Sequence, residues 1–121
     1  MGNIEKFEDI ESWKKARKLV GDIYRLASDG RFSKDFGLRD QIRRASISIM
    51  LNIAEGFGRR TDKELAQFLF LASGSVAEVQ SALYIAFHQK YIGEAEFDDL
   101  YNQCSDVARL LSGFIKYLRK T

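Results

Sequence analysis

The sequence predicts an all-α fold: an antiparallel up-down-up-down four-helix bundle that forms a single domain over residues 1–121. Three observations support this. Apolar residues recur at three- and four-residue steps along four segments, which is the period of an amphipathic helix. Proline is absent, and no run of alternating β-branched residues indicates a strand. The connections between the segments are short, so consecutive helices must run in opposite directions.

The first helix is expected over residues 10–28, with Asp9 as its N-cap. Its apolar stripe comprises Trp13, Ala16, Leu19 or Val20, Ile23, and Leu26 or Ala27. Lys14 and Lys18 lie mostly off that stripe, close to acidic residues. Alternating charge of this kind is typical of a solvated helix face, although a basic cluster can also attract phosphate.

The second helix is expected over residues 36–56, and it has two apolar patches. The core stripe comprises Leu38, Ile42, Ala45, Ile49 and Ile53, and the second patch comprises Ile47, Met50, Leu51 and Ala54. A helix that is apolar most of the way round is central or is covered by another subunit. We therefore predict self-association, with an interface formed by Arg44, Ile47, Met50, Leu51, Asn52, Ala54 and Glu55. Gly56 or Gly58 is expected to end the helix in a left-handed conformation.

The third helix is expected over residues 62–90. Thr61 and Glu64 have the spacing of a capping box, in which each side chain bonds a backbone donor at a helix start. Gly74 lies inside this segment, where glycine costs roughly 1 kcal/mol relative to alanine. We expect compensation for that cost, such as the close approach of a neighbouring helix.

The fourth helix is expected over residues 94–119. Acidic residues lie in its first turns and basic residues in its last, which complements the helix dipole. Cys104 falls on its apolar stripe and is expected to be a small core residue. With one cysteine and one histidine, His88, the chain lacks the residues for an intramolecular disulfide or a zinc site. We expect no metal, no cofactor and no enzymatic activity.

The charge distribution is uneven. The formal net charge is +2, which alone does not argue for nucleic acid. Residues 37–60 carry five basic and two acidic groups, whereas residues 61–121 carry six basic and eight acidic groups. The beginning of the chain does not have the pattern of a secretory signal, and no apolar run suggests a membrane span. We expect a cytoplasmic protein without a membrane partner.

Four short stretches carry a resemblance to a known family: Gln41-Ile42-Arg43-Arg44-Ala45, Ser48-Ile49, Asn52-Ile53-Ala54-Glu55-Gly56 and Gly74-Ser75-Val76-Ala77-Glu78. Together they resemble the bacterial four-helix bundle proteins associated with intervening sequences in 23S ribosomal RNA genes. The resemblance implies a homopentameric ring. It also implies an architecture similar to the accessory protein of diversity-generating retroelements, which works with a reverse transcriptase and RNA. It assigns no ligand or catalytic role to the motif residues.

Two functions follow as hypotheses. In the first, a non-enzymatic oligomer binds RNA or DNA through a basic surface, and the expected contacts are Arg39, Arg43, Arg59 and Arg60, with Lys14 and Lys18 as additions. Against this, the sequence shows no basic residues interleaved with exposed aromatic residues. In the second, the protein is an interaction scaffold that recruits another protein, for example a polymerase, without contacting nucleic acid. In that case the arginines would be consumed in ion pairs between subunits, with Glu55 or Glu78.

Overall fold

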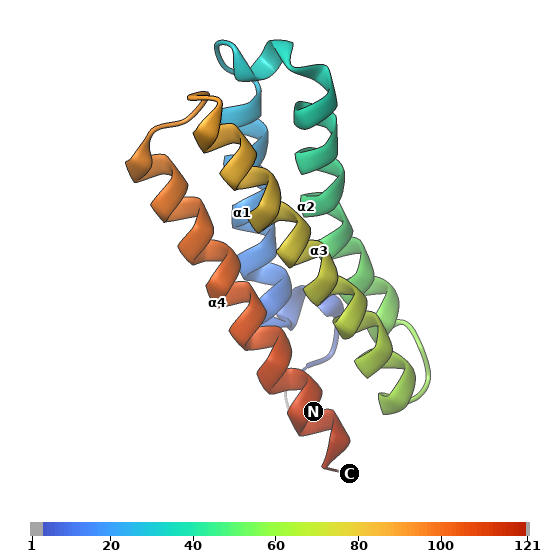
Figure 1. Cartoon of the computed structure of the whole chain (residues 1–121). Helices are drawn as coiled ribbons and strands as arrows, with labels where there is room; N and C mark the ends of the chain where they lie inside the picture. Colours follow the sequence, from blue (N-terminus) through green and yellow to red (C-terminus); the bar gives the residue numbers. More distant parts are fainter. Residues whose placement is uncertain (1–3, 121) are drawn as a thin grey trace.

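The computed structural model describes residues 4–120, which form four long helices and no strand (Figure 1). The helices are α1 (Glu11–Ala27), α2 (Phe36–Phe57), α3 (Asp62–His88) and α4 (Glu94–Arg119), and the single-turn 3-10 helices η1 (Phe7–Asp9) and η2 (Phe32–Lys34) precede α1 and α2. The predicted all-α class is therefore confirmed. The observed helix ends lie within two residues of the expected ones.

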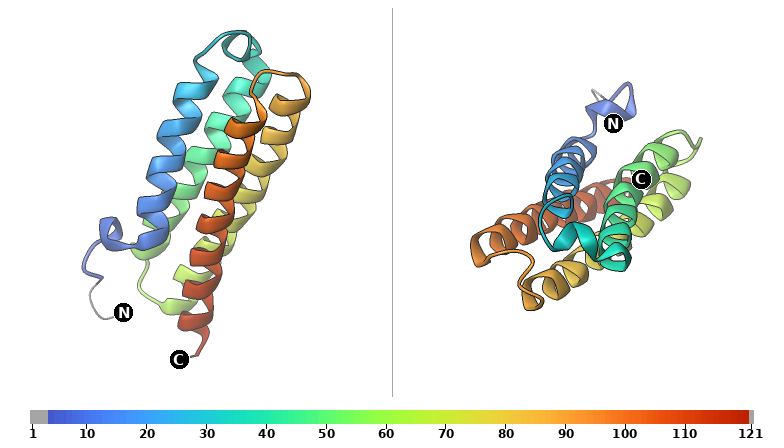
Figure 2. Two further views of the ribbon diagram at one scale, coloured as in Figure 1. Left: turned by 90° about the vertical axis from the view of Figure 1, so that its left-hand side faces the viewer. Right: turned by 90° about the horizontal axis from the view of Figure 1, so that it is seen from above.

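The four helices run alternately up and down, as short connections require. In Figure 1, α1 and α3 rise where α2 and α4 descend. Helix α1 packs against both α2 and α4, while α3 packs against α2 and α4, so the four helices close around one core. Figure 2 shows this arrangement from the side and from above. The beginning of α3 and the end of α4 consequently lie at the same end of the bundle.

The core consists of the apolar stripes that the helical period predicts. All five stripe residues of the second helix are buried: Leu38, Ile42, Ala45, Ile49 and Ile53. Cys104 is fully buried in α4, as expected for a small core residue. Two polar side chains at the α2–α3 contact are hydrogen-bonded, since Ser75 Oγ donates to Ser48 Oγ at 2.9 Å.

The helix starts are fixed by local hydrogen bonds. The Thr61 hydroxyl accepts a hydrogen bond from the Glu64 backbone N–H at 3.1 Å, which confirms the predicted cap of α3. The prediction for α1 is wrong, because its N-cap is Ile10. The Asp9 carboxylate instead accepts from the backbone N–H groups of Glu5 and Lys6, and so closes η1 one turn earlier.

The end of α2 also differs from the prediction. The capping residue, Gly58, has a φ of −75°, so it is right-handed and not left-handed. Gly56 lies inside the helix and is buried against Leu65 and Phe68 of α3. Glycine at this position leaves space for α3 to pack closely. The sequence pattern alone could not distinguish this role from that of a glycine that ends the helix.

Helix α3 carries apolar side chains on its outer face as well as on its core face. The exposed ones are Phe70, Leu71, Tyr84 and Ile85. By length and composition α3 is apolar enough to cross a membrane, but a core helix of a bundle meets the same criterion. Gly74 lies on this outer face, and apart from its own stretch of α3 no atom of the described residues falls within 4 Å of a Cβ built on it. The close approach of a helix that we expected at Gly74 is therefore absent within the subunit.

Candidate nucleic-acid interface

Basic side chains gather at the end of the bundle where α3 begins and α4 ends. Residues 55–64, from the end of α2 to the first turn of α3, and residues 116–120, at the end of α4, carry six basic and three acidic residues: Arg59, Arg60, Lys63, Lys116, Arg119 and Lys120, against Glu55, Asp62 and Glu64. The net charge of the two segments is thus +3, whereas residues 4–11, at the same end of the bundle (Figure 1), carry one basic and four acidic groups. The sequence places these groups far apart, and the antiparallel topology brings them together.

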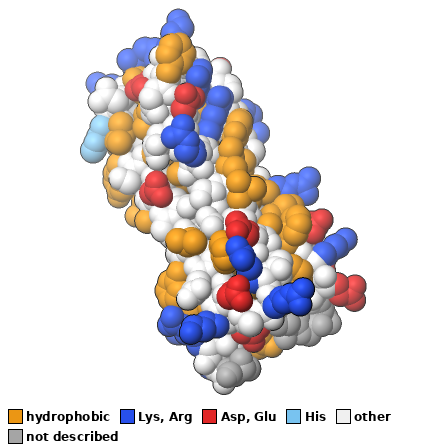
Figure 3. Space-filling view, turned by 90° about the vertical axis from the view of Figure 1, so that its right-hand side faces the viewer, with side chains coloured by type: hydrophobic (Ala, Val, Ile, Leu, Met, Phe, Trp, Pro, Cys, Tyr) orange, Lys and Arg blue, Asp and Glu red, His pale blue; other side chains and the backbone are white. Residues whose placement is uncertain are grey.

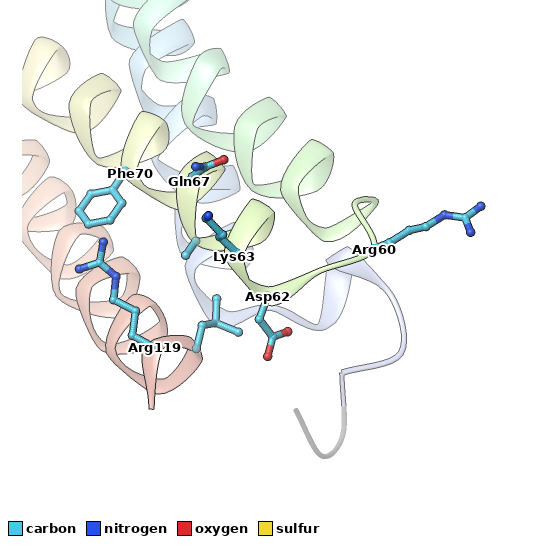
Figure 4. Close-up of a pocket in the computed structure, with 8 residues that line it drawn as sticks. Arg60, Asp62, Lys63, Gln67, Phe70 and Arg119 are labelled. Atoms are coloured by element: carbon cyan, nitrogen blue, oxygen red, sulfur yellow. The ribbon is translucent and has the colours of Figure 1, made fainter. Parts of the chain in front are cut away.

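A cavity of about 700 Å³ opens at this end, between the α2–α3 connection, the first turns of α3 and the last turn of α4. Its walls are formed by Arg60, Asp62, Lys63, Ala66, Gln67, Phe70, Leu118 and Arg119. Figure 4 shows Lys63, Gln67 and Arg119 extending beside Phe70, whereas Arg60 points away from them. We call this space the α3–α4 cavity.

An aromatic ring and a guanidinium group meet in the α3–α4 cavity. The Arg119 guanidinium carbon lies 4.7 Å from the centroid of the Phe70 ring, which is a cation–π contact across two helices. The Phe70 side chain is 47% exposed. This pairing corrects the sequence argument against nucleic-acid binding, because basic and exposed aromatic groups do meet here, although 49 residues separate them in the chain.

Of the six predicted nucleic-acid contacts, Arg59 and Arg60 lie at the basic end. Arg59 Nη2 donates to Glu55 Oε2 at 2.8 Å, and its guanidinium lies 4.9 Å from the Phe68 ring centroid. Arg60 is exposed and forms no ion pair with any residue from 4 to 120. Arg60 is therefore the freer of the two cations.

The other four predicted contacts lie elsewhere and are engaged locally. Arg39 Nε donates to Asp40 at 3.0 Å, and Arg39 Nη1 donates to the Ser33 carbonyl. Arg43 donates to Ser28 Oγ at 2.8 Å. These two arginines hold the α1–α2 connection against α2. Two residues of α1 are also paired: Lys14 with Glu11 at 3.3 Å, and Lys18 with Asp22 at 2.8 Å. The structure thus does not gather the six residues into one surface.

Four of the seven residues of the predicted oligomer interface, Arg44, Ile47, Leu51 and Asn52, line a shallow groove between α1 and α2, whereas Met50, Ala54 and Glu55 do not. This groove has a volume of about 610 Å³ and is lined by Tyr24, Asp40, Arg43, Arg44, Ile47, Ser48, Leu51 and Asn52. Leu51 is 63% exposed, while Met50 is half-buried and packs against the core. The Asn52 amide donates to the Ser48 carbonyl oxygen at 2.9 Å, so its polar group is satisfied inside α2.

Sequence reasoning missed the second exposed apolar surface, which lies on α3. Phe70 and Tyr84 are fourteen residues apart, as are Leu71 and Ile85, so each pair recurs on one side of the helix. Figure 3, which views the side of α2 and α3, shows hydrophobic side chains reaching the surface along the bundle. This surface could have been found from the sequence, because α3 has apolar residues at positions that lie off its core stripe.

The groups considered for chemistry are placed as follows. Burial raises the pKa of the Cys104 thiol to about 12, so it stays protonated and unreactive. His88 is exposed at the end of α3, beside the rings of Tyr84 and Phe87. Glu55 pairs with Arg59, and Glu78 accepts a hydrogen bond from Gln41. Within residues 4–120, no group of three or more His, Cys, Asp or Glu side chains has a metal-binding arrangement.

Fold and site together define a class: an all-α four-helix bundle with a basic and aromatic cavity at one end and uncovered apolar surface on α2 and α3. The family can then be named. The sequence model of the 23S rRNA-intervening sequence protein family matches residues 8–113, and the chain belongs to this family.

A solved structure supports the fold. The chain is similar to a protein of unknown function from the S23 ribosomal protein family of Bacteroides thetaiotaomicron, with a TM-score of 0.80 and 22% sequence identity. The similarity covers 87% of this chain and 98% of the other. A comparison with curated proteins finds no match.

Proposed function

We propose that this protein is a non-enzymatic homo-oligomer that binds RNA or other nucleic acid through the basic end of its bundle. The observation that carries the proposal is the α3–α4 cavity, where cations from two helices adjoin an exposed aromatic ring. Phosphate attraction by clustered lysine and arginine is the main source of nucleic-acid affinity. The predicted contacts Arg59 and Arg60 lie at this end, so they remain part of the proposal.

The oligomer is expected to be the homopentameric ring that the family resemblance implies. Exposed apolar residues on α2 and α3, such as Leu51 and Leu71, support self-association, since apolar surface of this kind is stabilised when another subunit covers it. Five copies of a +2 chain would carry a charge of about +10, which multiplies a weak attraction for phosphate. A cytoplasmic location without a membrane partner is part of the same proposal.

Solution mass and salt dependence test the proposal together. We would measure the mass of the purified protein by light scattering, alone and with a structured RNA, at low and moderate salt. The expected result is an oligomer that binds RNA at low salt and releases it as the salt concentration rises. Lysine and arginine side chains that contact phosphates release counterions from the RNA, and this release becomes less favourable at higher salt. An oligomer indifferent to RNA at both salt concentrations would contradict nucleic-acid binding.

One observation favours the alternative, a protein-interaction scaffold. Four of the six predicted contacts, including Arg39 and Arg43, are already engaged within the subunit, while the apolar surface of α3 is uncovered. In that case a protein such as a polymerase subunit would bind the oligomer, and RNA uptake would be absent at low salt.

A further inference from the structure

The Phe70 ring is exposed and, like the exposed rings of Tyr24 and Phe36, has a guanidinium group against its face. Tyr84, also exposed on α3, packs against Phe97 at 4.9 Å and Tyr101 at 5.7 Å between ring centroids. Phe70 has no ring–ring contact with a described residue, and the Arg119 guanidinium lies against its face. One face of the Phe70 ring is thus covered by the long, flexible Arg119 side chain and not by core residues.

The α3–α4 cavity has the size and lining of a small-ligand site. Its volume of about 700 Å³ lies within the range of pockets that hold small organic ligands. Ala66 and Leu118 contribute apolar wall, and the Gln67 amide can both donate and accept hydrogen bonds. In Figure 4, Gln67 and Lys63 lie beside the space next to Phe70.

The charge around this space favours an anion. Lys63 and Arg119 line the α3–α4 cavity, and neither forms an ion pair with the part of the chain that the structure describes. Asp62 also lines it, but in Figure 4 its carboxylate points away from Phe70 and Lys63. A ligand with a flat apolar group and an adjacent anionic group would match both features.

A nucleotide has this combination, and it can compete for the ring. Stacking of a base on an aromatic side chain is generally stronger than an exposed cation–π contact. A base can therefore take the place of Arg119 on Phe70. The released guanidinium can then form paired hydrogen bonds with a phosphate, with Lys63 as a second cation.

The exposed Phe70 ring also favours unpaired over base-paired nucleic acid. Bases inside a duplex are already stacked on each other and expose only their edges, so their faces cannot reach Phe70. A duplex would contact only the basic residues through its phosphates. We propose that the α3–α4 cavity binds an unpaired nucleotide, its base stacked on Phe70 and its phosphate held by Arg119 and Lys63. This inference rests on the proposed nucleic-acid function and makes it selective for single strands.

The test compares a short polyadenylate strand with an RNA duplex of similar length, using the full chain and fluorescence anisotropy. Phe70→Leu keeps apolar volume and removes the stacking face, so single-strand affinity should fall about five- to tenfold while duplex affinity stays unchanged. Phe70→Trp retains a stacking face and should retain the single-strand affinity. Circular dichroism of each variant confirms that the helices are intact.

Phe36→Leu is the matched control. Phe36 is also exposed, with the Arg39 guanidinium carbon 4.8 Å from its ring centroid, but it lies at the start of α2, at the other end of the bundle. Its replacement should leave both affinities unchanged. An unchanged single-strand affinity for Phe70→Leu would overturn the stacking site. An equal loss of affinity for the single strand and the duplex in Phe70→Leu would also overturn the stacking site, although nucleic-acid binding itself would stand. If the unmodified protein binds neither RNA, the proposed function fails and this inference fails with it.

Discussion

Gly56 of α2 and Phe68 of α3 approach so closely that no side chain fits between them: a Cβ built on Gly56 would lie 2.6 Å from the Phe68 Cβ. The same Cβ would lie 3.0 Å from a methyl carbon of Leu65. Both neighbours belong to the helix that packs most extensively on α2, so the glycine sets the distance between the two helices.

Gly56→Ala should therefore destabilise the protein, by about 1–3 kcal/mol, because the methyl group forces α2 and α3 apart. Urea denaturation measures the change. Gly21→Ala is the matched control: Gly21 is exposed in α1, nothing lies within 4 Å of a Cβ built on it, and alanine there should stabilise by about 0.5–1 kcal/mol. Equal effects of the two substitutions would contradict the close-packing role of Gly56.

Asp22 should make stability depend on pH in the acid range. Partial burial raises its pKa, but hydrogen bonds from Lys18, Gln103 and Arg25 together lower it from an ordinary value of 3.8 to about 2. Because the folded pKa is depressed, the stabilisation is fully present above about pH 4 and is lost as pH falls toward 2. The shift corresponds to about 2 kcal/mol.

Chemical denaturation at a series of pH values checks this prediction. Between about pH 4 and pH 2, Asp22→Asn should lose less stability than the unmodified protein, since an amide does not titrate. Identical pH profiles would show that Asp22, which joins α1 to Gln103 of α4, contributes nothing to the acid sensitivity.

Replacing exposed apolar residues should dissociate the proposed oligomer without unfolding the subunit. The sequence points to Ile47→Glu or Met50→Glu, but Met50 packs against the core and its replacement would also destabilise the fold. Leu51→Glu and Ile85→Glu are cleaner, because both side chains are about half exposed or more. Light scattering should report a lower mass, with the helical circular dichroism unchanged. A mass unaffected by both variants would contradict an interface on these faces.

Loss of the predicted cations should weaken RNA binding and leave the oligomer intact. We expect Arg59→Gln with Arg60→Gln to lower RNA affinity and to reduce the salt dependence of binding, by about 0.7–0.9 in log–log slope for each phosphate that is no longer neutralised. Arg60→Gln alone should account for most of the effect, because Arg59 is paired with Glu55. Arg109→Gln removes one exposed charge in the middle of α4 and serves as the control for Arg60→Gln alone. An unchanged slope in the double variant would argue strongly against the basic end.

Local signals in the sequence were sufficient where a single helix decides the outcome. The Thr61 cap, the core stripe of α2 and the burial of Cys104 follow from spacing, because the residues involved lie within a few turns of one another. Spacing was insufficient where the deciding neighbour comes from another helix. Gly56 resembles an ending signal in sequence, and only the packing of α3 shows why it has no side chain.

The candidate site, too, was predicted in part from the sequence and decided in part by the packing of the helices. Composition and periodicity by themselves determined four amphipathic helices, their antiparallel order and an excess of basic groups over residues 37–60. The tertiary structure decided which cations are engaged, since it places Arg43 in a hydrogen bond with Ser28 and leaves Lys63 without an ion partner among the described residues. It also brought Phe70 and Arg119 together from separate helices. The physical reason is that helical period fixes the face on which a residue lies, whereas the contact between two faces depends on how whole helices pack.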